Sequence, residues 1–240
     1  MMTVSRFSKI LGAWAASTAL IMLGVLSASP HVHADDDDEN FKIQKGFEIS
    51  PVRLDLDGKD RDLVGLGSYI VNAQIPCNDC HSLFPPNGAP TAFTPAGNPF
   101  LHKPPLGPFT GTITVNPKTY LGGGNDFGPV GGRGPDIVSR NLTPDRTGRP
   151  EGGRTFSEFR RIMRTGVDLD HLHPSCSSSI TPTCLPPPFN GEVLQIMPWP
   201  AYRNMTDRDL RAIYEYLKAI PCISHSGTVG LQANLYQTCP

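Results

Sequence analysis

PCNDCH, residues 76–81, is the stretch of this sequence that decides the fold: two cysteines stand three positions apart, and a histidine follows the second one directly. The pattern C-x-x-C-H is compatible with a redox-active dithiol, half of a zinc site, or the attachment of a haem. A thioredoxin-type dithiol belongs in a β-α-β setting, which the flanking sequence does not show. A zinc site needs four ligands, usually with a second pair of similar spacing, whereas Cys176 and Cys184 stand eight positions apart.

Attachment of a haem explains every residue of the motif. Two thiols about one helical turn apart can bond to the two vinyl groups on one edge of a porphyrin, and the adjacent histidine can then ligate the iron. The sequence contains one C-x-x-C-H. It therefore predicts one haem c, bound covalently through Cys77 and Cys80, with His81 as a ligand of the metal.

Residues 1–34 have the three parts of a secretory signal peptide. Two basic residues precede an apolar run over 11–26, and a pattern of small residues ends at Ala34. The apolar run has 16 residues, which is short of the roughly 20 that a membrane-spanning helix needs. We therefore predict cleavage near Ala34 and export to the periplasm. Cleavage after Ala28 and an uncleaved membrane anchor are the alternatives.

The composition describes a globular chain with much irregular structure. Apolar residues make up 38% of the 240 residues, but 24 glycines and 25 prolines place many residues in turns. The formal net charge is −1, and it becomes −3 when the two cations of residues 1–34 are removed. Such a weak, slightly negative charge argues against a nucleic-acid-binding protein.

Apolar residues at helical spacing predict three helices. They span residues 60–73, 155–166 and 205–221, and the last has the strongest pattern. Thr155 and Glu158 stand at the positions of a capping box, which marks the start of the second helix. The fold class that this pattern predicts is all-α, with about three to four helices.

Between the first two helices, residues 82–139 form a long insert rich in glycine and proline, with one short strand expected over 109–117. Its glycines lack the Lys-Ser/Thr and the strand-loop-helix frame of a phosphate-binding loop. We place the domain at 59–223, between an acidic, flexible lead-in (35–58) and a C-terminal extension (224–240). Because three short helices bury too small a core to organise so much loop, a large apolar cofactor is expected at the centre.

The other four cysteines predict two disulfides. In an oxidising compartment such cysteines tend to pair, and four of them allow three connectivities. We favour Cys176–Cys184 and Cys222–Cys239, because each of these pairs closes a short local loop. Free thiols are the alternative.

A second axial ligand decides what a haem iron can do, because a closed iron transfers electrons whereas an open one binds a gas or peroxide. Met197 lies in QIMPWPAY, an extended, proline-bounded segment that can present a thioether to a haem face. Met163 falls on the apolar stripe of the second helix, where packing explains it, and Met205 starts the last helix. His171 and His173 stand in an acidic loop, where they could bind a separate metal, supply a histidine ligand, or simply be solvated.

Four stretches make the sequence similar to class I c-type cytochromes, in particular to monohaem relatives of the cytochrome c subunits of periplasmic alcohol and sugar dehydrogenases. They are GSYIVNAQIPCNDCHS, RNLTPDRTG, TFSEFRRIMRTGVD and MPWPAYRNMTDRDLRAIYEYLKAIP, within about residues 62–221. The resemblance implies a cytochrome c fold around one covalent haem. It also implies that the first and last helices cross, with Gly67 and Tyr69 near Tyr214 and Leu217.

The same resemblance implies the roles of several residues. His81 would be the proximal ligand and Met197 the distal one, while Trp199 and the pair Arg140 and Asn141 would line the haem edge and its propionates. For Arg140, a solvated surface charge is the alternative. The sequence departs from such subunits in its long insert, in an added loop with two histidines, and in having one haem motif where these subunits often have more.

The resulting prediction is a periplasmic carrier of single electrons rather than an enzyme. The resemblance implies a periplasmic dehydrogenase as donor and a terminal oxidase or another cytochrome as acceptor. One alternative is a haem enzyme or a gas or redox sensor with an open or labile sixth iron position. Another is a docking subunit whose haem is incidental and whose inserted loops hold a partner.

Overall fold

The structure is a computed structural model that describes residues 34–82, 100–101, 114–115, 117–224 and 239. Within these ranges the chain is mainly helical, but it also contains two small antiparallel sheets, so the fold is not strictly all-α. The predicted signal peptide before Ala34 and most of the predicted extension after residue 224 lie outside the described residues.

The helical elements are short, and none in the described part of the chain is both long and apolar enough to cross a membrane. In chain order they are α1 (Ala34–Ile49), α2 (Arg61–Tyr69), the π-helical turn η1 (Ile70–Gln74), α3 (Cys77–His81), the 3-10 turn η2 (Val130–Gly132), α4 (Pro150–Gly153), α5 (Phe156–Thr165), α6 (Trp199–Tyr202) and α7 (Asp207–Ala219).

The three predicted helices are confirmed as α2 continued by η1, α5, and α7, and a polar side chain caps the start of each. The Asp60 carboxylate accepts two backbone N–H groups at the start of α2. Thr155 and Glu158 form the predicted capping box, and Gly166 ends α5 in the left-handed conformation. Thr206 caps α7. Local sequence signals therefore set these helix ends.

The first part of the lead-in predicted over 35–58 is helical, because residues 34–49 form helix α1. The division of the chain into two compact units falls after Asp37, so most of α1 belongs to the larger unit. Ile43 is buried, and Phe47 packs against the core. Acidic residues suit the N-terminal end of a helix dipole, and the two apolar contacts supply the burial that a short helix needs.

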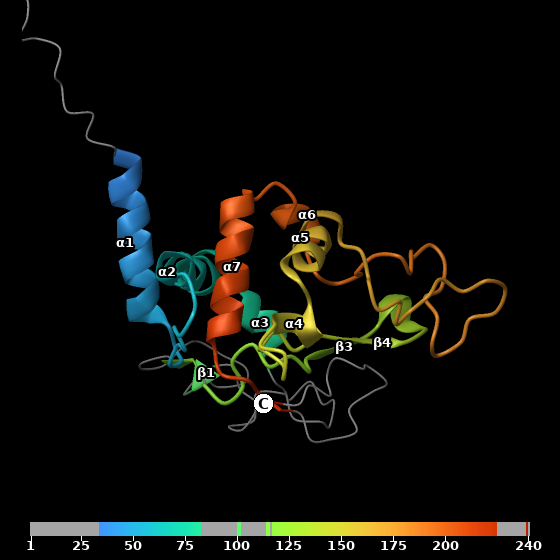
Figure 1. The fold of residues 1–240 in the computed structure, drawn as a ribbon. Helices are drawn as coiled ribbons and strands as arrows, with labels where there is room; N and C mark the ends of the chain where they lie inside the picture. Colours follow the sequence, from blue (N-terminus) through green and yellow to red (C-terminus); the bar gives the residue numbers. More distant parts are fainter. Residues whose placement is uncertain (1–33, 83–99, 102–113, 116, 225–238, 240) are drawn as a thin grey trace, which may run out of the picture. The chain divides into compact units, whose positions relative to one another are not determined.

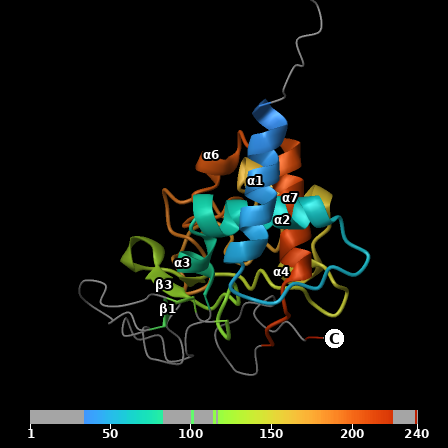
Figure 2. The same ribbon diagram turned by 90° about the vertical axis from the view of Figure 1, so that its left-hand side faces the viewer.

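Helix α2 crosses between α1 and α7 (Figures 1 and 2), and one of its glycines lies at each crossing. A Cβ atom on Gly65 would lie 2.8 Å from the backbone oxygen of Ile43 in α1. A Cβ atom on Gly67 would lie 1.9 Å from the backbone oxygen of Ala212 in α7. The first and last predicted helices therefore cross, and they meet near the expected region of Tyr214.

We expect Gly67→Ala to lower the free energy of unfolding by about 3 kcal/mol or more, because the added methyl group overlaps a backbone atom that cannot move aside. Urea denaturation followed by circular dichroism measures the change. Gly58→Ala is the matched control, since nothing lies within 4 Å of its Cβ position and only its positive φ of 63° is strained. That control should cost about 1–2 kcal/mol, and equal losses for both variants would contradict the close crossing.

The described residues of the insert include two pairs of short strands. Strand β1 (Phe100–Leu101) pairs with β2 (Thr114–Val115), which lies inside the strand expected over 109–117, while residues 102–113 and 116 lie outside the described residues. Strand β3 (Asp126–Pro129) pairs with β4 (Asp136–Val138) with a shift in register. The insert thus contributes two short hairpin-like pairings rather than loop alone.

A buried polar network joins the insert to the helices. The hydroxyl group of Tyr120 lies 2.8 Å from that of Tyr216 in α7, and it donates to Asn72 Oδ1 in η1 at 2.6 Å. Tyr120 and Tyr216 are almost completely buried. Because an unpaired hydroxyl inside a protein is costly, these mutual bonds fix the insert near Tyr120 against the core.

Both predicted disulfides are present. Cys176 pairs with Cys184 and Cys222 pairs with Cys239, whereas Cys77 and Cys80 remain free thiols. The cysteines of the C-x-x-C-H motif are therefore separate from the structural ones.

Candidate functional site

The motif residues form helix α3, a single turn that follows Pro76. Asn78, inside the motif, is buried, and its side-chain oxygen accepts hydrogen bonds from the N–H of Leu121 (3.1 Å) and the hydroxyl of Ser82 (3.0 Å). A helix of five residues is not stable alone, so these contacts with the insert hold the motif in place.

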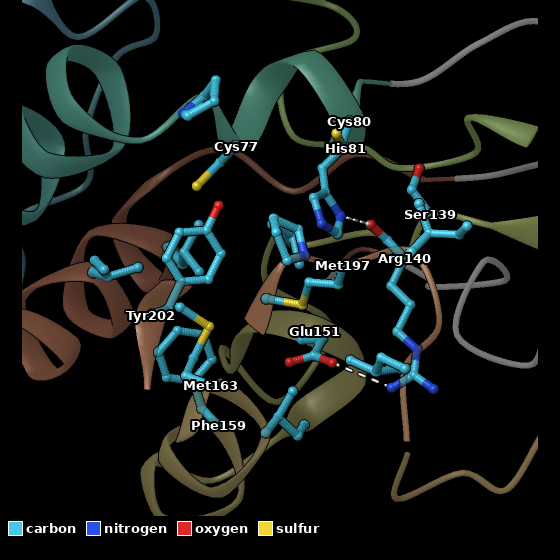
Figure 3. A pocket seen from close by; sticks show the side chains of 18 of the residues that line it. Cys77, Cys80, His81, Ser139, Arg140, Glu151, Phe159, Met163, Met197 and Tyr202 are labelled. Carbon is cyan, nitrogen blue, oxygen red and sulfur yellow. Dashed lines mark hydrogen bonds and ion pairs between the residues drawn. The ribbon is translucent and has the colours of Figure 1, made fainter. Parts of the chain in front are cut away.

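Helix α3 borders an apolar cavity with an empty volume of about 1160 Å³, counting its open mouth. Cys77, Cys80 and His81 stand on one wall, and α5 and α7 supply aliphatic and aromatic side chains (Figure 3). These include Phe159, Ile162, Met163, Ile213 and Leu217. The cavity is the large apolar space that the short helices alone do not fill.

The two motif thiols are protonated and unpaired. Burial raises the pKa of the Cys77 thiol to about 12, and the nearby thiol of Cys80 adds to the rise. Burial and the neighbouring carboxylate of Asp79 also raise the pKa of Cys80. A redox-active C-x-x-C pair needs a lowered thiol pKa, so this environment is unlike that of a disulfide oxidoreductase.

The imidazole of His81 is oriented by a backbone carbonyl. Its Nδ1 lies 2.8 Å from the backbone oxygen of Arg140, to which it can donate. Burial lowers the pKa of His81 below its ordinary value, although this hydrogen bond opposes the change. A neutral imidazole that donates from Nδ1 has its Nε2 lone pair available, which is the usual arrangement of a metal-ligating histidine.

The glycine-rich part of the insert supports this hydrogen bond, which the sequence analysis missed. The N–H of Gly123 donates to the backbone oxygen of His81, and a Cβ atom on Gly123 would lie 2.5 Å from the backbone oxygen of Arg140. Leu142 and Leu121 pair through their backbones at 2.9 Å on the other side of Arg140. Gly123, in the stretch YLGGGN, therefore allows the backbone of the insert to pack against His81 and Arg140. The composition alone did not indicate this close backbone contact.

Two methionines line the cavity. Figure 3 shows the thioether of Met197 directed into the same space as the imidazole of His81. Met163, predicted as a packing residue, is buried on α5 and also lines the cavity. Tyr202 stands near Cys77 in the same view, and burial raises the pKa of its hydroxyl. Cys77, Cys80, His81 and Met197 thus all line one cavity.

Arg140 is buried and is not the solvated surface charge considered as its alternative. Its guanidinium contacts Glu151 (3.3 Å), Asp170 (3.1 Å) and Asp168. Burial alone would lower the pKa of Arg140, but the three carboxylates outweigh it and raise that pKa. Burial raises the pKa of Glu151 despite the nearby guanidinium. Arg140 lines the cavity, but its charge already has carboxylate partners within the protein.

We expect Arg140→Leu to lower the free energy of unfolding by about 3–5 kcal/mol, because it leaves the buried carboxylates of Glu151 and Asp168 without their cation. Chemical denaturation measures this loss. Arg160→Leu is the control, because Arg160 and its partner Asp207 are largely exposed and such pairs contribute about 0–1 kcal/mol. A loss below 1 kcal/mol for Arg140→Leu would contradict the buried-pair assignment.

Two predicted site residues do not reach the cavity wall. Asn141 is fully buried, and its side chain bonds to the backbone oxygen of Ile223 (2.8 Å) and to Thr143 (2.7 Å). Trp199 packs against Gly166 at the end of α5. The expected contacts of Asn141 and Trp199 with a haem edge are therefore not supported, because each side chain is used elsewhere.

The two histidines of the added loop also lie away from the cavity lining. His171 is exposed and lies 3.9 Å from Glu192, and His173 lines a smaller neighbouring cavity. Among the residues that the structure describes, no group of three or more His, Cys, Asp or Glu side chains is arranged to hold a metal ion.

Comparison with known proteins gives a partial likeness. Over 102 residues the chain is 30% identical to the alcohol dehydrogenase (quinone), cytochrome c subunit, of Gluconacetobacter polyoxogenes, and equally to that of Komagataeibacter europaeus. Each match covers 42% of this chain but 17% of the relative, so the chain spans a minor part of the length of these relatives. No family model and no solved structure matches. The comparisons support a loose relation to cytochrome c subunits.

Proposed function

We propose that this protein is a cytochrome c with one covalently bound haem, and that it carries single electrons. The observation that carries the proposal is that two free thiols, the imidazole of His81 and the thioether of Met197 all line a single apolar cavity. Cys77 and Cys80 would form the thioether bonds to the haem, His81 would be the proximal ligand of the iron, and Met197 the distal one. This donor set is that of a His/Met-ligated haem c.

The residues present fit such a group in three respects. The motif thiols take part in no disulfide. The His81 ring uses Nδ1 for a backbone hydrogen bond, which leaves Nε2 for a metal. The remaining walls are mostly aliphatic and aromatic, as a porphyrin face requires. When bound, the haem supplies a one-electron Fe(III)/Fe(II) couple.

The role of the chain is then to hold both ligands and to keep water out. The apolar walls from α5 and α7 lower the local dielectric constant, and the backbone bond to Arg140 keeps the imidazole of His81 in one orientation. A thioether ligand favours Fe(II), so Met197 would raise the reduction potential. If His81 and Met197 both ligated the iron in either oxidation state, electron transfer would need little reorganisation of the protein.

Export and partners are proposed from the sequence and the relatives. A signal peptide over residues 1–34, cleaved near Ala34, would deliver the chain to the periplasm, where a haem domain over 59–223 would function. The relatives are named as the cytochrome c subunit of a quinone alcohol dehydrogenase. We therefore propose a periplasmic dehydrogenase as the electron donor, and a terminal oxidase or another cytochrome as the acceptor.

The test is whether carbon monoxide changes the visible spectrum of the reduced, haem-loaded protein. We expect no change over minutes, because an iron with two protein ligands has no free position. Rapid and complete binding would contradict the electron carrier, and it would favour the alternative of a haem enzyme or sensor with an open or labile sixth position. Myoglobin, whose sixth iron position is open, is a positive control for the gas.

A further inference from the structure

Trp199 was expected at the haem edge, but its side chain lies outside the cavity lining. Its contacts indicate a different role. A Cβ atom built on Gly166 would lie 2.2 Å from Trp199 Nε1 and 2.3 Å from Cε2. The indole therefore lies directly against the glycine that ends α5. Gly166 has a φ of 67°, so both its conformation and the space beside it require glycine.

The same end of α5 also binds the chain on the other side of Met197. The N–H of Leu194 donates to the backbone oxygen of Gly166 at 2.7 Å, and Val167 and Val193 form an antiparallel bridge. Residues 195–198, which include Met197, thus lie between Leu194 and Trp199, and both of these residues contact Gly166.

Helix α6 restrains the Trp199 end of this segment. The N–H of Trp199 donates to the backbone oxygen of Met197 at 2.8 Å, and the N–H of Arg203 donates to that of Trp199 at 3.1 Å. Arg164, in the last turn of α5, donates to the backbone oxygen of Arg203 at 2.8 Å. The backbone of Trp199 is therefore held within helix α6, while its indole lies against Gly166.

We propose that Trp199, seated on Gly166, is a positioning residue for Met197: it fixes the end of segment 195–198 so that the thioether stays on the iron. This inference rests on the proposed function. The physical reason is that a segment fixed at both ends loses little conformational freedom when its side chain binds. With one end released, the thioether exchanges between bound and unbound states.

The test compares Trp199→Ala with Phe156→Ala in the haem-loaded protein. Phe156 is an aromatic residue of α5 that does not line the cavity, and its ring packs edge-on against that of Tyr214 with the ring centroids 5.6 Å apart. Both variants lose aromatic packing and stability, but only the first releases Met197. We expect carbon monoxide to bind reduced Trp199→Ala at least tenfold faster than reduced Phe156→Ala, and Trp199→Phe to restore most of the wild-type behaviour.

The outcomes separate this proposal from the one on which it rests. If wild type excludes carbon monoxide, Met197→Ala binds it, and Trp199→Ala binds it no faster than Phe156→Ala, the positioning role is wrong while the electron carrier stands. If wild type itself binds the gas rapidly, the proposed function fails first. Gly166→Ala, which displaces the indole from below, is a second variant and should match Trp199→Ala.

Discussion

Replacement of both Cys77 and Cys80 by serine should abolish covalent haem binding. The two thiols are the free cysteines of the described chain, and both line the cavity. Serine keeps the size and polarity of the side chain but cannot form a thioether with a vinyl group. After expression with a haem c maturation system, haem-dependent staining of a denaturing gel should show a strong band for wild type and none for the double variant.

The control for this experiment is Cys176→Ser with Cys184→Ser, which removes two cysteines and one disulfide outside the motif. We expect this variant to keep its stained band, with a loss of stability of about 2 kcal/mol from the short loop it opens. A stained band in Cys77→Ser with Cys80→Ser would overturn covalent attachment. Loss of staining in both double variants would show instead that maturation depends on general folding.

Met197→Ala should open the iron and lower the reduction potential. The thioether of Met197 enters the cavity that His81 borders, and alanine cannot reach the iron. Axial ligands set haem potentials over a range of about 0.8 V, and loss of a thioether removes a ligand that favours Fe(II). We expect a fall of on the order of 0.1 V or more in a redox titration, together with rapid binding of carbon monoxide by the reduced variant.

Met163→Leu is the matched control, because Met163 also lines the cavity and leucine keeps its volume. It should shift the potential little and leave the iron closed to carbon monoxide. If instead reduced Met163→Leu binds carbon monoxide and reduced Met197→Ala does not, the distal ligand is Met163 of α5. That result would preserve the electron carrier but correct the ligand.

Features that depend on residues close together in the sequence could be predicted, whereas features that depend on contacts between distant residues could not. The capping box of Thr155 and Glu158 and the short disulfide loops are local, and the structure agrees with both predictions. Helix α1 was missed because its charged start hides two apolar residues, Ile43 and Phe47, whose burial depends on a partner helix.

Contacts that a side chain makes across the fold could not be predicted from the sequence. Arg140 has its carboxylate partners 11 to 30 positions further along the chain, so its burial had no local sign. Asn141 bonds to Ile223, which is still more distant in sequence. The resemblance implied that Trp199 lines the haem edge, whereas its contact with Gly166 depends on how α6 packs against the end of α5.

The crossing of α2 and α7 has a consequence for the order of events during synthesis. Ribosomes make the chain from its N-terminus, so Cys77 and Cys80 emerge well before α7, which brings Ile213 and Leu217 to the cavity wall. About 140 residues separate α3 from the end of α7. The haem of the proposed cytochrome would therefore have to reach Cys77 and Cys80 before α7 closes this wall of the cavity.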